Sequence, residues 1–144
     1  MTDTPTNCPI DLITSVWHDR GLEGLLGVTI DSIEDGKASV SMDLKPEHLN
    51  FAGTAHGGVL FSLADSAFAL ACNTRHNLNV ASGCSIEFMR PAMPGDKLTA
   101  TAQWVDTSGR SSIYDIVVTN QNNDTIVLFK GRSHQTSKSL SDLK

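Results

Sequence analysis

The segment that most constrains the fold is Gly58 to Arg75, the longest apolar stretch of the chain. Its apolar side chains fall on nearly every face of a helix, and a helix that is apolar all round is a buried one. Its many alanines favour helix formation and close packing. The rest of the chain must therefore surround this helix.

Strand-like segments flank the helix on both sides. Glu34-Asp35-Gly36 predicts a hairpin turn between the first two of them. Strands that alternate apolar and polar residues need one covered face, and only the apolar helix is large enough to cover it. We therefore expect an α+β fold in which a curved antiparallel sheet wraps around one central helix. The predicted strands are Leu26 to Ile33, Lys37 to Leu44, Val80 to Met89, Lys97 to Val105, Ser112 to Thr119 and Thr125 to His134.

The two ends of the chain have simpler patterns. Asp11 to Arg20 has the spacing of a short amphipathic helix, and Gly21 follows as a stop signal. Met1 to Pro9 and Gln135 to Lys144 are polar and are interpreted as tails. Because no repeat or linker occurs, we expect one domain over residues 1–144, with an ordered core of about residues 10–135.

Composition narrows the class of protein. A net charge of −5 argues against a nucleic-acid partner, which usually requires a basic face. The three cysteines Cys8, Cys72 and Cys84 lack metal-ligand spacing, so we expect no metal. Cys72 and Cys84 are interpreted as buried thiols in a reducing compartment. Since the chain shows neither a signal-peptide pattern nor about 18 consecutive apolar residues, we expect a cytoplasmic protein without a membrane partner.

Two features at the central helix suggest chemistry. Gly57 and Gly58 lie where a polar loop enters the helix, and the first N–H groups of a helix lack internal partners. The helix dipole adds partial positive charge there, and glycine allows close approach. Such an end can stabilise an oxyanion. A glycine pair of this kind can equally be a tight helix entry.

The second feature is Asp65, a lone carboxylate in the middle of the apolar helix. Asp65 lies two turns beyond Gly58 on the same face, at a separation of about 10 Å. A carboxylate that activates water or attacks, together with an amide that stabilises the oxyanion, suits acyl transfer. The alternative is a structural carboxylate that accepts hydrogen bonds or lies at a subunit contact.

Several motifs together resemble one family. His56-Gly57-Gly58 followed by Leu60 to Asp65 resembles the signature of the phenylacetic acid degradation (PaaI) acyl-CoA thioesterases of the hot dog superfamily. The resemblance covers Leu26 to His134. Further matching segments are Ser85 to Pro91, Gly95-Asp96 with Leu98 to Ala100, Tyr114 to Ile116, and Phe129 to His134.

This resemblance implies a hot dog dimer that pairs into a homotetramer, with metal-free sites between subunits. The matching catalytic residues are Asp65 as carboxylate, Gly57 as oxyanion donor and Asn50 as the polar loop residue. Asn50 and Gly57 would come from one subunit and Asp65 from the other. Coenzyme A would be part of the substrate, and no separate cofactor is expected.

The substrate-binding residues are assigned less directly. His56, which either lines the site or only shapes its loop, is treated together with Gly58 as site-lining. Phe61 and Phe68 are candidates for an apolar acyl pocket, as is Phe51, although filling of the core explains all three equally well. The hydroxyl residue that some relatives carry one turn after the carboxylate is Ala69 here. Ser82 or Ser66 is the expected substitute.

For the CoA phosphates the candidates are Arg90, Arg110 and Ser111, with Arg132 a weaker one. Solvated surface arginine is the alternative for each. The family points to arylacetyl-CoA substrates such as phenylacetyl-CoA or hydroxyphenylacetyl-CoA. Medium-chain or long-chain fatty acyl-CoA is a second possibility within the class. A non-catalytic acyl-CoA-binding hot dog protein is the competing reading, and Asp65 argues against it.

Overall fold

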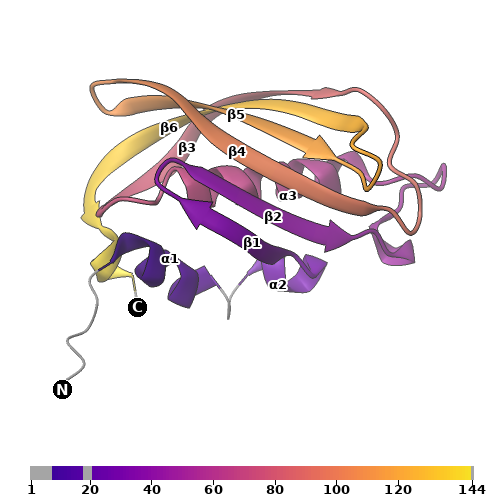
Figure 1. Ribbon diagram of the computed structural model, residues 1–144, viewed down its shortest axis with the longest axis horizontal. Helices are drawn as coiled ribbons and strands as arrows, with labels where there is room; N and C mark the ends of the chain where they lie inside the picture. The colour runs from indigo at the N-terminus through magenta and orange to yellow at the C-terminus, as the bar shows by residue number, and fades with distance from the viewer. Residues whose placement is uncertain (1–7, 18–20, 144) are drawn as a thin grey trace.

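The computed structural model describes residues 8–17 and 21–143, and the chain folds as one layer of sheet around one long helix (Figure 1). The elements in chain order are α1 (Pro9–Trp17), α2 (Leu22–Leu26), β1 (Thr29–Glu34), β2 (Lys37–Asp43), η1 (Pro46–His48), α3 (Gly57–Ala71), β3 (Asn77–Phe88), β4 (Lys97–Ser108), β5 (Ser111–Thr119), β6 (Thr125–Ser139) and η2 (Leu140–Asp142).

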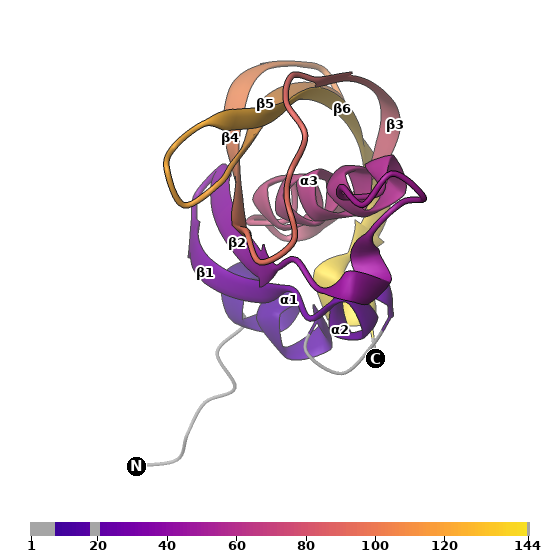
Figure 2. The same ribbon diagram turned by 90° about the vertical axis from the view of Figure 1, so that its right-hand side faces the viewer.

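The six strands form a single antiparallel sheet in the order β1-β2-β4-β5-β6-β3. Figure 2 shows the sheet curving around α3, with α1 and α2 on the open side below the helix. The register aligns small and branched side chains in inward-facing rows, so that each row packs against the helix. One fully buried row consists of Val40, Ala100, Val118 and Val127.

Helix α3 is buried along most of its length because the sheet approaches it closely. Phe68 is fully buried, and its ring contacts the rings of Tyr114 and Phe129. It lies directly over Gly131 of β6, where a Cβ atom would be only 2.8 Å from the ring. A glycine is needed at that position for the helix to pack. This arrangement is the hot dog fold that the family resemblance implied.

The structure corrects three predicted boundaries. The segment Leu26 to Ile33 is not one strand, because α2 ends at Gly27 in a left-handed conformation (φ 73°) and β1 begins at Thr29. The central helix ends at Ala71, before Arg75. The final strand β6 continues to Ser139, since it pairs with β3 over its whole length.

The predicted C-terminal tail is therefore wrong for most of its length. Its first five residues belong to β6, and Leu140 behind them is 1% exposed. At the other end, Pro9 already belongs to α1, while residues 1–7 and Arg20 lie outside the described residues. Cys72 is buried as predicted, but Cys84 is exposed on β3, the outermost strand of the sheet.

Among the helices of residues 8–17 and 21–143, none is long and apolar enough to cross a membrane.

Candidate active site

The loop that leads into α3 is held in shape by Asn50. Its amide oxygen accepts the N–H groups of Ala52 (2.9 Å) and Thr54 (3.2 Å), and its amide nitrogen donates to Thr54 Oγ1 (3.1 Å). This pattern is an Asx-type turn, in which a side chain replaces a backbone partner. One amide hydrogen of Asn50 is left for another partner.

The start of α3 is capped by its own preceding residue. His56 Nδ1 accepts the N–H of Gly58 at 2.8 Å, and the His56 carbonyl accepts the N–H groups of Val59 and Leu60. Gly57 is then the helix residue whose N–H makes no hydrogen bond within the described part of the chain. The loop-shaping interpretation of His56 thus agrees with the geometry, and the free N–H belongs to the glycine that the sequence indicated.

A cleft of about 310 Å³ opens beside Gly57. A Cβ atom on Gly57 would lie 3.5 Å from the ring of Phe88, so that ring forms one wall. Arg90 also lines the cleft, and its guanidinium donates to the carbonyl of Thr125 at 3.0 Å. The cleft therefore combines a free N–H at a helix start, an apolar wall and a cation. The lining residues are Thr54, Ala55, Gly57, Leu60, Phe88, Met89, Arg90 and Pro91.

Asp65 lies on the side of α3 that the sheet does not cover. It is half-buried, and its carboxylate makes no hydrogen bond or ion pair with the described residues. Burial raises the pKa of Asp65, and the nearby charge of Glu23 on α2 raises it further. Asp65 follows Gly57 by eight residues, which is about 12 Å along the helix axis. Within one chain, the carboxylate and the free N–H do not share a cleft.

Neither serine proposed to support the carboxylate does so within this chain. Ser66 donates to the Ser62 carbonyl at 2.7 Å. Ser82 donates to the Arg132 carbonyl at 3.2 Å, and the Arg132 guanidinium is bonded back to Ser82. Arg132, the weaker CoA candidate, is thus already engaged.

The remaining predicted residues are dispersed. Phe68 lies in the core and does not line an open pocket, because Gly131 and two aromatic rings enclose it. Phe61 packs edge-on against Phe129 and is only partly buried, whereas Phe51 is fully exposed on the loop. Arg110 and Ser111 form the β4–β5 turn beside His134, at the opposite end of β6 from Val127 and the cleft.

Sequence reasoning did not identify two groups of residues in this region. Phe88 and Met89 line the cleft because β3 ends beside the start of α3. Glu23 approaches Asp65 because α2 packs under α3 (Figure 2). Neither relationship has a local sequence signal, since each depends on how distant segments pack.

Residues 52–127 match the thioesterase superfamily. The chain belongs to this superfamily. The acyl-coenzyme A thioesterase PaaI of Escherichia coli K12 is 45% identical to this thioesterase over 84% of the chain and 86% of the relative. The structure of E. coli PaaI, from the phenylacetic acid degradation operon, superposes with a TM-score of 0.86 at 40% identity and covers 90% of this chain and 94% of that one. The structure of a hypothetical thioesterase from Streptococcus pneumoniae with coenzyme A gives a TM-score of 0.74 at 25% identity, over 77% of this chain and 90% of that one.

Proposed function

We propose that this thioesterase hydrolyses arylacetyl-CoA thioesters, of the phenylacetyl or hydroxyphenylacetyl type, to the free acid and CoA at a site formed by two copies of the chain. Similarity to the E. coli acyl-CoA thioesterase supports acyl-CoA as the substrate class. The aryl group is inferred from that relative's phenylacetic acid degradation operon.

The observation that carries this proposal is the free N–H of Gly57 at the open end of α3. In thioester hydrolysis the carbonyl oxygen gains negative charge as the nucleophile adds. A fixed N–H at a helix start stabilises that charge without having to reorganise. We assign this role to Gly57 and assign Asn50, with its remaining amide hydrogen, to orienting the thioester or the attacking water.

The carboxylate in this mechanism is Asp65 of the partner copy. It acts as the general base that activates water, or as the nucleophile that attacks the carbonyl. Its own Gly57 is about 12 Å away along the same helix, too far to act on one carbonyl. A half-buried carboxylate with no partner in its own chain suits a position facing a second subunit.

Two surfaces of the protomer fit such a pairing. Strand β3 is the longer of the two edge strands of the sheet, with twelve residues, and a long free edge favours strand pairing with another chain. Val80, Phe88 and Met89 are exposed large apolar residues on or next to it. The start of α3 lies next to the end of this strand, since a Cβ atom on Gly57 would lie 3.5 Å from the ring of Phe88. We propose a homodimer through these surfaces, pairing again into a homotetramer.

For CoA, Arg90 is the strongest phosphate candidate because it lines the cleft beside Gly57. Arg110 and Ser111 are at the far end of their own chain, so they would reach the same CoA only from another subunit. No separate metal or cofactor enters this scheme, and the protein is expected to be cytoplasmic.

The test combines substrate profiling with subunit mixing. Thiol release is measured on phenylacetyl-CoA, 4-hydroxyphenylacetyl-CoA and decanoyl-CoA, with the oligomer followed by light scattering. The proposal expects the aryl substrates to give the highest kcat/KM. Faster turnover of decanoyl-CoA would identify the fatty acyl alternative, and binding of all three without thiol release would identify an acyl-CoA-binding protein.

Subunit mixing tests the shared site. Asp65→Asn and Gly57→Val should each be nearly inactive alone. A mixed dimer contains one site with both Gly57 and Asp65 intact, so mixing after dissociation should restore about a quarter of wild-type turnover. Asp115→Asn, an exposed carboxylate paired with Lys130 on the outer face, is the matched control and should stay active. No recovery on mixing, or an active monomer, contradicts a site shared between copies.

A further inference from the structure

A second and larger cavity, of about 500 Å³, lies at the C-terminal end of α3. This volume is in the range of small-molecule sites, and the mouth of a curved sheet is a common place for one. Helix α3 ends at Ala71, while β4 and β6 continue beyond it, so the sheet is left unfilled at this end. Gly57 and this helix end are about 21 Å apart along the axis, so within one chain the cavity is separate from the cleft beside Gly57.

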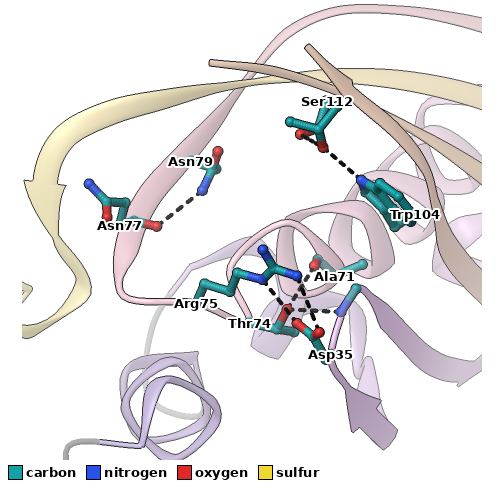
Figure 3. A network of polar contacts seen from close by, with 10 residues as sticks. Asp35, Ala71, Thr74, Arg75, Asn77, Asn79, Trp104 and Ser112 are labelled. Carbon is teal, nitrogen blue, oxygen red and sulfur yellow. Dashed lines mark hydrogen bonds and ion pairs between the residues drawn. The ribbon is translucent and has the colours of Figure 1, made fainter. Parts of the chain in front are cut away.

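The walls of the cavity are held by specific contacts between the β1–β2 turn and the helix end. Thr74 Oγ1 accepts the N–H of Gly36 at 2.9 Å, and Arg75 makes two hydrogen bonds with Asp35, at 3.2 and 3.3 Å (Figure 3). A Cβ atom on Gly36 would lie 3.0 Å from the Cβ of Trp104, and its φ of +72° also favours glycine. The carbonyl of Gly36 accepts the backbone N–H of Trp104 at 2.8 Å, so this turn holds Trp104 in the wall.

Tyr114 presents an unsatisfied polar group to this cavity. It is 7% exposed and lines the cavity, and its hydroxyl has no hydrogen-bond partner among the described residues. The hydroxyl itself is not fully buried, so it is accessible from the cavity and can hydrogen-bond to a ligand there. Burial raises the pKa of Tyr114 to about 12, so the hydroxyl keeps its proton and can donate.

The other lining groups indicate what kind of ligand fits. Trp104 donates its indole N–H to Thr107 Oγ1 at 2.7 Å, and the hydroxyls of Thr107 and Ser112 are hydrogen-bonded at 2.7 Å. The indole N–H therefore already has a partner, and the ring is held in place. The side-chain amide of Gln135 makes no hydrogen bond in the described part of the chain. Gln103 uses its amide nitrogen and keeps its amide oxygen. The opposite charges of Asp35 and Arg75 offset each other.

We propose that this cavity binds an uncharged planar nitrogen heterocycle of the adenine type, stacked on an aromatic wall and held at its edge by amide and phenol groups. Side-chain amides both donate and accept, which matches the edge of adenine. An indole or phenol ring is a favourable stacking surface for such a base. The offset charges at the rim favour the neutral ring over a free anion. The base can come from a free nucleoside or from the adenosine end of a CoA molecule.

The test titrates the wild-type oligomer with adenosine by calorimetry. We expect saturable binding that Tyr114→Phe and Gln135→Leu each weaken about tenfold or more, because each leaves an edge group of the base unpaired. The kcat of thiol release by Tyr114→Phe should equal that of wild type, since Tyr114 does not line the cleft beside Gly57. Phe88→Leu, in the other cleft, should leave adenosine binding unchanged.

Three results would overturn the proposal: no saturable adenosine binding to wild type, binding that both cavity variants retain, or binding that Phe88→Leu abolishes. Because Gln135 is on the surface and Tyr114→Phe removes one oxygen, both variants should fold, and circular dichroism checks this. CoA that competes with adenosine in wild type, together with a KM for the thioester that Tyr114→Phe raises, identifies CoA as the source of the base. Adenosine binding unaffected by CoA identifies a free nucleoside.

Discussion

His56 Nδ1 accepts the N–H of Gly58 at 2.8 Å, and this one bond decides which amide at the start of α3 is open to a substrate. A side chain that caps a helix satisfies one of its unpaired N–H groups. Here the capped group is that of Gly58, so the N–H of Gly57, which lines the cleft, is left without a partner among the described residues. His56, which the sequence left as either site-lining or loop-shaping, is a helix cap in this position.

Replacing His56 separates these two roles. His56→Ala removes the cap, and we expect a loss of about 1 kcal/mol of unfolding free energy together with reduced turnover. His56→Asn places another good capping residue there and should recover most of both. Urea unfolding and thiol release measure the two quantities. If His56→Asn restored stability but left the protein inactive, the imidazole would have a chemical role.

Asp65→Asn should lower kcat by about 10² to 10⁴, the usual effect of removing a general base. KM should change much less, because the CoA portion binds elsewhere. The variant should stay folded, since asparagine is close in size. Retention of more than about a third of wild-type turnover would make Asp65 a structural carboxylate.

The raised pKa of Asp65 has consequences for both rate and stability. Since the ionised form is the active one, turnover should rise with pH through a value above the ordinary Asp pKa of about 3.9. Glu23→Gln removes the second cause of the raised Asp65 pKa, so the rise of turnover with pH should occur at lower pH in this variant. If the rise stayed at the same pH, it would reflect the ionisation of a group other than Asp65.

The raised pKa of Asp65 makes the free energy of unfolding decrease as pH rises, which is the opposite of the usual Asp case. The folded state holds the Asp65 proton more tightly than the unfolded state, so stability falls as pH rises from about 3.9 through the raised pKa. Asp65→Asn should therefore raise Tm at pH 7, and the gain should shrink as the pH falls through the raised pKa and vanish below about 3.9. Thermal melts of both proteins across this range measure it.

Gly131→Ala should destabilise the core. Its Cβ would lie 2.8 to 2.9 Å from the ring atoms of Phe68, so either helix or strand must shift. Overpacking of this kind costs about 1–3 kcal/mol. Gly83→Ala is the matched control on the neighbouring strand, because its Cβ would meet only the end of Arg132 at 3.4 Å. Equal denaturation midpoints for the two variants would contradict this packing.

Chelators should leave turnover unchanged. Across residues 8–17 and 21–143, no group of three or more His, Cys, Asp or Glu side chains is arranged to hold a metal ion. Thiol release is followed after dialysis against EDTA. Lost activity that a divalent ion restores would mean that the carboxylate does not act alone.

The sequence by itself determined the central helix and the six strands, and it indicated the two residues on which the proposed mechanism rests. An apolar helix and alternating strands encode burial directly, because their periods are local. The glycine pair and the lone carboxylate of Asp65 were visible for the same reason: each breaks the pattern of its own segment.

Tertiary structure alone decided which residues surround the central helix, Gly57 and Asp65. Leu140 is buried only because β6 pairs with β3 far past the last apolar alternation, and no local pattern encodes that partner. Phe68 fills the core because Gly131, more than sixty residues away, leaves room for its ring. Likewise Glu23 reaches Asp65, and Phe88 reaches Gly57, through packing between distant segments. Such contacts depend on how whole elements pack, which local sequence periodicity does not record.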